Sequence, residues 1–247
     1  MCIRDRFPLP SEAPWYEPLS LLTMIASHTT KIKLATAILI APLRNPALLA
    51  KTVATLDTIS KGRLELGVGL GWQKEEFDTA GVSFEDRSEI FWETLDICKL
   101  LWQDSPISFK GKNFNFDDIW CHPQPTQGQN LPLLFGLKMT HENAQRISKV
   151  GHGWIPIKTS RDFISAGKDI LMEAFIKEGR QDQPRIRGQL PTCVDNNGVP
   201  NIDLTLKELE KSMAAGLDEV EVFPINFVQS PDDIYKVLKI ISEVKQI

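Results

Sequence analysis

The segment of this chain that most constrains its fold is a short apolar run, followed by a helix-like pattern and a second apolar run. Residues 33–40 (KLATAILI) are rich in Ile, Leu and Thr. That composition is typical of a strand buried on both faces, and two prolines, Pro42 and Pro46, follow it. The first run therefore predicts a strand over residues 33–40.

After Pro46 the spacing of apolar residues changes from that of a strand to that of a helix. One helix face is formed by Leu49, Val53, Leu56 and Ser60. Gly62 has the position of a C-cap glycine, and residues 63–68 predict a second strand. Two buried strands joined through a helix pair in parallel and need helices to cover them. We therefore expect a binding site where the strands end, at residues 41–45 and 69–72.

Further along the chain, apolar periodicity predicts more helices and strands. The expected helices cover residues 19–27, 87–103, 141–150 and 162–178, then a segment with a capping box of Thr205 and Glu208 that stops at Gly216, and a last helix opened by Ser230 and Pro231. The other expected strands cover residues 131–135, 153–157, 186–194 and 219–223. Residues 73–86 are predicted as a polar connection, and residues 104–130 as an excursion with a small hairpin over 107–109 and 114–116.

These predictions give an α/β fold in which strands alternate with helices. Such alternation is typical of either a doubly wound sheet or a (β/α)8 barrel, and a barrel built from this chain would lack two strands. The residues alone do not decide between the doubly wound sheet and the barrel. At 247 residues the chain fits one domain over residues 1–247, in which residues 1–6 match no expected element.

Composition argues against several classes of function. With 42% apolar and 24% charged residues the chain has the make-up of an ordinary soluble globule, and its net charge of −4 argues against a nucleic-acid partner. The longest mostly apolar run, residues 34–43, is too short to cross a membrane. The four cysteines have neither C-x-x-C spacing nor a histidine at ligand spacing. We expect free thiols in a reducing cytoplasm and no metal site.

Glycines alternate at the end of the second predicted strand, at Gly67, Gly69 and Gly71, and Trp72 follows them. The pattern partly matches a dinucleotide fingerprint, but its third glycine falls one residue early and Trp72 would crowd a pyrophosphate. We favour an interpretation in which a planar ligand approaches bare backbone at the strand end. The alternative is that these glycines serve only a tight turn.

Gly136, Lys138 and Thr140 lie between a predicted strand and the start of a predicted helix. Backbone N–H groups at a helix N-terminus point outward, where the helix dipole favours anions, and Lys138 adds a positive charge. This arrangement suits a phosphate group. The alternative is a plain N-cap at Thr140 beside a solvated lysine. Closer to the glycines, Glu75 and Glu76 are candidates for acid–base chemistry, with a charged loop as the ordinary explanation.

Several motifs, taken in order, resemble the luciferase-like monooxygenase family, and among its branches the deazaflavin-dependent oxidoreductases. The resemblance covers about residues 15–225. It rests on TAILIAPLRNP (36–46), ATLDTISKGR (54–63), LGVGLGW (66–72), EF (76–77), LW (101–102), FKG (109–111), PQP (123–125) and GHGW (151–154).

The resemblance implies a (β/α)8 TIM barrel that binds FMN or the deazaflavin coenzyme F-420 at the carboxyl ends of its strands. Thr36, Ala37 and Ile38 would back the ring, with a non-prolyl cis peptide between Ala37 and Ile38. Gly69 and Gly71 would allow close approach of the ring. No catalytic residue is assigned, because the protein would mainly position the ring and exclude water.

Three further roles follow from the same resemblance. Trp72 would shape the substrate side of the ring, and Arg44 would pair with Asp57 or with a ligand anion. The phosphate would sit on the turn that carries Gly136, Lys138 and Thr140.

The chain also departs from the family pattern. Members usually show Gly-Gly-x-Ser at the phosphate turn and Gly-Asp-Gly-Trp after the next helix, whereas this chain has GLKM at residues 136–139 and GHGW at residues 151–154. The family's first strand, first helix and second strand, with an Asp–His pair, should precede Phe7 and have no counterpart. We therefore expect an N-terminally truncated sequence whose barrel lacks about its first two strands.

The implied activity is oxidation or monooxygenation of a small organic substrate, with reduced FMN and O2 or by hydride transfer with coenzyme F-420. A flavin reductase is the expected supplier of reduced cofactor. Two alternatives stay open: a TIM-barrel enzyme that acts on a phosphorylated small molecule, and a non-catalytic fragment. Because an incomplete barrel exposes strand edges, we also expect a homo-oligomer.

Overall fold

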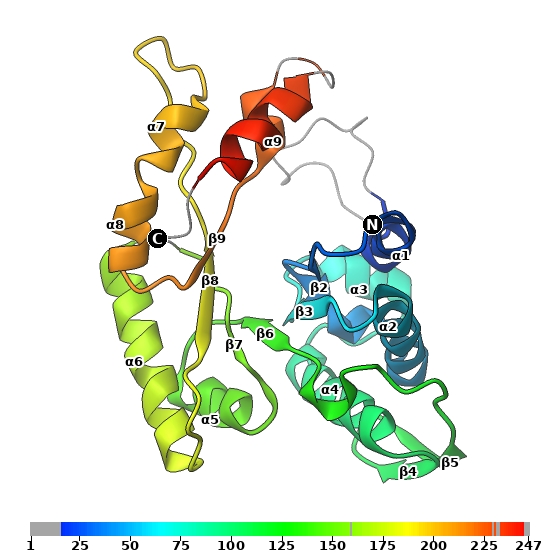
Figure 1. Ribbon diagram of the computed structural model, residues 1–247. Coiled ribbons are helices and arrows are strands. Elements are labelled where there is room, and N and C mark those ends of the chain that lie inside the picture. The colour runs from blue at the N-terminus through cyan, green and yellow to red at the C-terminus, as the bar shows by residue number, and fades with distance from the viewer. Residues whose placement is uncertain (1–15, 159, 229, 231–232, 245–247) are drawn as a thin grey trace. The chain divides into compact units, whose positions relative to one another are not determined.

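The computed structural model describes residues 16–158, 160–228, 230 and 233–244 (Figure 1). Contacts divide the chain into two compact units, one that ends at Gly136 and one that begins at Leu137. In each unit parallel strands alternate with helices, which confirms the α/β class expected from the sequence. The single domain over residues 1–247 stays a prediction, and the leader over residues 1–6 lies outside the described residues.

The first unit is built around the buried strand β3. All of its residues are buried, and β1, β2 and β6 each pair with it in parallel. The register places Ile40 beside Gly69 and Gly69 beside Gly136. The carboxyl ends of β2, β3 and β6 therefore meet at Gly69. The elements of this unit are α1 (Pro18–His28), β1 (Leu34–Ala35), β2 (Leu39–Ile40), η1 (Ala41–Leu43), α2 (Pro46–Ser60), β3 (Leu64–Gly69), α3 (Lys74–Ala80), α4 (Arg87–Gln103), β4 (Ile107–Lys110), β5 (Asn115–Ile119), η2 (Gly128–Asn130) and β6 (Leu133–Gly136).

The strand predicted over residues 33–40 is broken into β1 and β2. Ala35 and Ala37 are exposed, so the prediction that this strand is buried on both faces is wrong. Between the two pieces, the Thr36 hydroxyl donates a hydrogen bond to the carbonyl oxygen of Gly67 at 2.8 Å. The Thr36 N–H also donates to the carbonyl oxygen of Glu65 at 3.4 Å, so both the backbone and the side chain of Thr36 attach the segment to β3.

The helices of the first unit agree with the sequence except at one place. α4 has the predicted bounds, and α2 begins at Pro46 because the Asn45 side chain accepts a hydrogen bond from the Leu48 N–H at 3.1 Å. The polar connection predicted over residues 73–86 contains a helix, α3, so that prediction is wrong. This helix buries Phe77 completely, which its short polar sequence conceals.

The predicted hairpin is confirmed, with longer strands than expected. β4 and β5 pair antiparallel in a sheet of their own, apart from the parallel strands. The Glu93 carboxylate of α4 accepts hydrogen bonds from the backbone N–H groups of Lys112 at 2.7 Å and Asn113 at 2.9 Å. This carboxylate anchors the hairpin turn on α4.

The second unit consists of the parallel strands β7, β8 and β9 with flanking helices, and α5 and α6 lie side by side (Figure 1). A methyl group added at Gly167 of α6 would lie 2.3 Å from the ring of Trp154, so this helix packs on the Trp154 face of the strands. The elements are α5 (His141–Val150), β7 (Gly153–Trp154), α6 (Arg161–Lys177), β8 (Arg185–Gln189), α7 (Ile202–Leu206), α8 (Leu209–Ala214), β9 (Glu219–Glu221), η3 (Pro224–Phe227) and α9 (Ile234–Ser242).

The predicted capping box in the second unit is wrong. Thr205 lies inside α7, and its hydroxyl accepts a hydrogen bond from the Cys193 N–H at 2.9 Å, so it is not available to cap α8. Two short helices replace the single predicted one. Pro231, predicted to open the last helix, lies outside the described residues, while the hydroxyl of Ser230 donates to the Asp233 carboxylate at 3.0 Å.

The cysteines and helices of the described residues bear on two sequence expectations. Cys98, Cys121 and Cys193 are free thiols, as predicted for these three. Within the part of the chain that the structure describes, every helix is too short or too polar to cross a lipid bilayer.

Candidate functional site at the strand ends

Ile38 lies against two glycines at the point where three strands of the first unit end. A methyl group added at Gly69 would lie 2.7 Å from Ile38 Cδ1, and one added at Gly136 would lie 2.8 Å from Ile38 Cγ2. Both glycines therefore make room for the Ile38 side chain. Ile38 itself is half-buried and Ala37 is exposed, so the two residues present an apolar surface at the carboxyl ends of β2, β3 and β6.

This arrangement changes the interpretation of the glycines. The sequence suggested that Gly69 gives a planar ligand access to bare backbone, whereas the chain's own Ile38 occupies that space. The peptide bond between Ala37 and Ile38 is cis, which confirms the expectation from the family resemblance. Thr36 is 5% exposed and its hydroxyl is engaged with Gly67, so it holds this segment in place.

Gly71 and Trp72 continue from the carboxyl end of β3. Gly71 has a φ of +79°, and a methyl group there would lie 2.8 Å from Ile40 Cγ2 and 3.0 Å from Phe77 Cε2. The tight-turn alternative therefore accounts for Gly71 without a ligand. Trp72 is 55% exposed, which is unusual for a tryptophan and leaves its ring available to a partner or ligand.

Two acidic candidates and one basic candidate of the first unit have different surroundings. Glu75 is exposed, whereas Glu76 is 3% exposed and burial raises the pKa of its carboxyl group. Arg44 pairs with Glu17 at 2.8 Å, so the expected pairing with Asp57 is wrong. Asp57 is fully buried and accepts hydrogen bonds from the backbone and side-chain N–H groups of Gln127.

The predicted phosphate turn leads into α5 of the second unit. The Thr140 hydroxyl accepts a hydrogen bond from the Asn143 N–H at 3.2 Å, and the Asn143 side chain donates to the Lys138 carbonyl oxygen at 2.9 Å. Thr140 is thus an N-cap, and the side chain of Lys138 is exposed. The geometry matches the plain N-cap alternative, and binding of phosphate by Gly136, Lys138 and Thr140 stays a prediction.

Sequence reasoning missed a charged face on β8 and β9. The Glu219 carboxylate accepts hydrogen bonds from Arg185 Nε at 2.7 Å and from Arg187 Nε at 2.6 Å. Further along β9, one carboxylate oxygen of Glu221 is buried and has no hydrogen-bond partner. The available signal was the alternation of charged residues, R-I-R over residues 185–187 at the start of the strand predicted from residue 186, and E-V-E within the strand predicted over residues 219–223.

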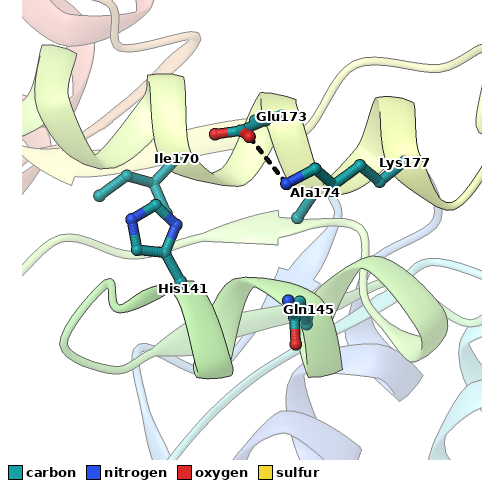
Figure 2. Close-up of a pocket in the computed structure, with 6 residues that line it drawn as sticks. All are labelled: His141, Gln145, Ile170, Glu173, Ala174 and Lys177. Atoms are coloured by element: carbon teal, nitrogen blue, oxygen red, sulfur yellow. Dashed lines mark ion pairs between the residues drawn. The ribbon is translucent and has the colours of Figure 1, made fainter.

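A pocket of the second unit lies between helices and not at strand ends (Figure 2). It is lined by His141 and Gln145 of α5 and by Ile170, Glu173, Ala174 and Lys177 of α6. Glu173 and Lys177 form an ion pair of 2.8 Å one helical turn apart. Among the described residues no group of three or more His, Cys, Asp and Glu side chains could hold a metal ion.

Comparison with known proteins gives both the fold and the family. The oxygenating constituent of 3,6-diketocamphane monooxygenase from Pseudomonas putida, solved with FMN, superposes with a TM-score of 0.74 at 16% identity, over 92% of this chain and 82% of that one. The chain therefore has the fold of the luciferase-like TIM-barrel enzymes.

Curated relatives are similar over about 70% of the chain. An uncharacterized protein of Mycobacterium tuberculosis is 33% identical over 174 residues, which is 70% of this chain and 59% of that protein. The F420-dependent glucose-6-phosphate dehydrogenase of Kineococcus radiotolerans is 29% identical over 70% of this chain and 51% of that enzyme. The chain thus spans little more than half the length of these relatives. Residues 5–198 match the model of the luciferase-like monooxygenases, and the chain belongs to that family.

Proposed function

We propose that this protein is an oxidoreductase that uses reduced FMN with O2, or hydride transfer with coenzyme F-420, on a small organic substrate. The observation that carries the proposal is the apolar surface of Ala37 and Ile38 over Gly69 and Gly136, at the carboxyl ends of adjacent parallel strands. Barrel enzymes place their active sites at this end of the strands. One structural neighbour was solved with FMN and one relative is named as F420-dependent, which supports either cofactor.

The residues present fit a planar aromatic ring. Such rings bind against apolar surfaces with few polar groups, and a half-buried isoleucine beside an exposed alanine offers such a surface. The two glycines fix how far Ile38 projects, because any side chain at either position would push it outward. Ile38 would therefore hold the ring, and Gly69 and Gly136 would position Ile38.

The chain's own residues would mainly bind, orient and exclude water. When bound, the cofactor would supply the reducing equivalents. Reduced FMN would use O2 as a co-substrate, whereas F-420 would transfer a hydride. Ala37 and Ile38 would exclude water from one face of the ring, and Trp72 would limit the space for the substrate. A flavin reductase partner belongs to the FMN case; a cytoplasmic location and a homo-oligomer stay predictions.

Fluorescence titration with reduced FMN and with reduced F-420 tests the proposal. We expect Ile38→Asp to weaken binding of the preferred cofactor at least tenfold, because a carboxylate on this surface would be desolvated by the ring. Ile38→Val keeps the β-branched shape and should stay within about threefold of the unchanged protein, since it removes a single methylene.

If neither cofactor binds to the unchanged, folded protein, the proposed function is wrong. Equal affinities of the Asp and Val variants would place the ring elsewhere. Comparison of FMN with riboflavin, which lacks the phosphate, tests the predicted phosphate turn separately. Lys138→Gln should weaken the binding of FMN but not the binding of riboflavin. Lys149→Gln, which removes an exposed lysine in the last turn of α5, is the matched control.

A further inference from the structure

One surface of the first unit is formed by the outward sides of α1 and α2, which lie side by side (Figure 1). On α2 the outward positions include Leu48, Thr52, Thr55 and Ile59, which follow one another at intervals of four, three and four residues. Residues at these intervals share one face of a helix, and helices that pair with a partner helix use the same spacing. Leu48 is 66% exposed, and Met24 of α1 is also exposed.

The two threonines in this row have hydroxyl groups that are already bonded to α2 itself. Thr52 Oγ1 donates to the carbonyl oxygen of Leu48 at 2.8 Å, and Thr55 Oγ1 donates to that of Lys51 at 2.8 Å. A hydroxyl whose donor is used within its own helix loses little when another surface covers it. The row from Leu48 to Ile59 can therefore be buried without leaving these donors unpaired.

The charged groups of α1 and α2 are engaged within the first unit. α1 contains no Asp, Glu, Lys or Arg. On α2, Asp57 is buried and bonded to Gln127, and Lys51 Nζ donates to the carbonyl oxygen of His122. The outward row of α2 therefore carries no charge of its own.

Other helices of the molecule have the charged exterior that is usual for a helix facing water. Exposed positions of α5 carry Glu142, Arg146 and Lys149, and exposed positions of α6 carry Asp162 and Lys177. The outward surface of α1 and α2 differs from these faces in composition, although all four helices cover parallel strands.

An aromatic side chain borders α2. Trp120 is 62% exposed, and its ring centroid lies 5.7 Å from that of His122. The bond from Lys51 to His122 and a hydrogen bond of 3.4 Å from Thr58 Oγ1 to the Gln124 carbonyl oxygen hold the segment after Trp120 against α2. Exposed tryptophan is typical of protein interfaces.

We propose that this surface is the interface through which two copies of the chain associate. We call it the α1–α2 face, and its members are Met24, Leu48, Thr52, Thr55, Ile59 and Trp120. In a two-fold symmetric pair both copies use the same patch, so a charge near the axis would meet a like charge. The members of the α1–α2 face bring no such charge, and their apolar groups provide the burial that drives association.

The same composition argues against other occupants. A charged partner would find no complementary charge on this row, and helices that lie on a lipid surface carry Lys and Arg beside their apolar face. The sequence led us to expect a homo-oligomer through exposed strand edges, whereas this proposal places the contact on helices.

Analytical ultracentrifugation of the folded chain over a wide range of concentrations tests the proposal. We expect a dimer that dissociates at micromolar concentration or below. Leu48→Glu should weaken dimerisation at least tenfold, because the interface would desolvate the carboxylate. This variant should stay folded, since the position is exposed and lies in the first turn of α2, where the helix dipole favours an acidic residue. Leu100→Glu, the matched change at an exposed leucine of α4, should leave dimerisation unchanged.

Two further variants test the rest of the face. Ile59→Glu, at the other end of the row, should also weaken dimerisation at least tenfold for the same reason. Trp120→Ala should weaken it at least threefold, because it removes a large apolar surface at the border.

Three results would overturn the proposal. A monomer at every concentration is one, and a dimer that both glutamate variants leave intact is another, because the contact would then lie elsewhere. The third is a monomer that sediments with vesicles of phosphatidylcholine and phosphatidylglycerol, which would assign the face to a lipid surface. No cofactor enters these measurements, so failure to bind FMN or F-420 would count against the proposed function and leave this inference standing.

Discussion

The amino ends and the carboxyl ends of the strands differ in how their polar groups are used. Before β3, Arg63 donates hydrogen bonds to the carbonyl oxygens of Ser60, Ile32, Thr29 and Ala26 and to the Thr29 hydroxyl, at 2.6–3.0 Å. In the second unit, before β8, Arg180 binds the carbonyl oxygens of Ser148 at 3.0 Å and Gly151 at 2.6 Å and stacks on Phe175.

The carboxyl ends look different in both units. Trp72 after β3 is 55% exposed and Ile157 after β7 is 68% exposed. Glu221 at the end of β9 keeps a buried oxygen without a partner. The amino ends thus use their polar groups to hold helix ends and loops together, while the carboxyl ends of β3 and β7 are followed by exposed apolar side chains. This division is the one that barrel enzymes make between stability and activity.

The largest expected effect tests how tightly an amino end is packed. A methyl group added at Gly153 would lie 2.0 Å from the carbonyl oxygen of Arg185, so β7 and β8 must separate to admit it. We expect Gly153→Ala to lower the free energy of unfolding by about 4 kcal/mol, measured by urea denaturation. Ser165→Ala, on the exposed side of α6, is the control. A loss below about 1 kcal/mol would show that this end is not closely packed.

The next effect tests the arginine that holds α1. Arg63→Ala should cost about 3 kcal/mol of unfolding free energy, because it leaves several carbonyl oxygens without donors. Arg63→Lys keeps the charge but not the forked geometry, and should lose about half as much. Arg161→Ala, at an exposed position in α6, should change stability by less than about 0.5 kcal/mol. If the Lys variant is as stable as the unchanged protein, charge and not geometry is what matters.

The smallest effect on stability is expected at a carboxyl end. Trp72→Ala should change the free energy of unfolding by less than about 0.5 kcal/mol, since most of the ring is already exposed. The same variant should weaken binding of the preferred reduced cofactor at least threefold in the fluorescence titration. Tyr235→Ala, which removes a 78% exposed ring from α9, should change neither quantity. A large loss of stability in Trp72→Ala would break the comparison, because it would give this end a structural role.

Local features of the fold could be predicted from the sequence because they depend on neighbouring residues. The bounds of α4 and α5 follow from apolar periodicity and from the Thr140 cap. The hairpin of β4 and β5 follows from alternation around a turn. Helix α3 was missed because a short helix with two buried positions has too little periodicity to stand out from a charged loop.

The candidate site was predicted only in part, because neighbours across a sheet are distant in sequence. The segment of Thr36, Ala37 and Ile38 was identified from the family resemblance, and its cis peptide is present. The role of Gly69 was not predicted, because Ile38, which fills the space beside it, lies between β1 and β2, about 30 positions earlier in the chain. The predicted pairing of Arg44 with Asp57 was wrong for the same reason. Its partner in the structure, Glu17, precedes α1 and is distant from Arg44 in sequence.

The sequence by itself determined most of the helices and strands, where glycines fall and to which family the chain is similar. The tertiary structure decided what those residues contact. Ile38 on Gly69 and Gly136, the carbonyl oxygens around Arg63, and the buried oxygen of Glu221 all depend on strand register and packing. A parallel sheet joins strands through intervening helices, so side chains of neighbouring strands that meet on one face are separated in sequence by a crossover of about a dozen residues or more.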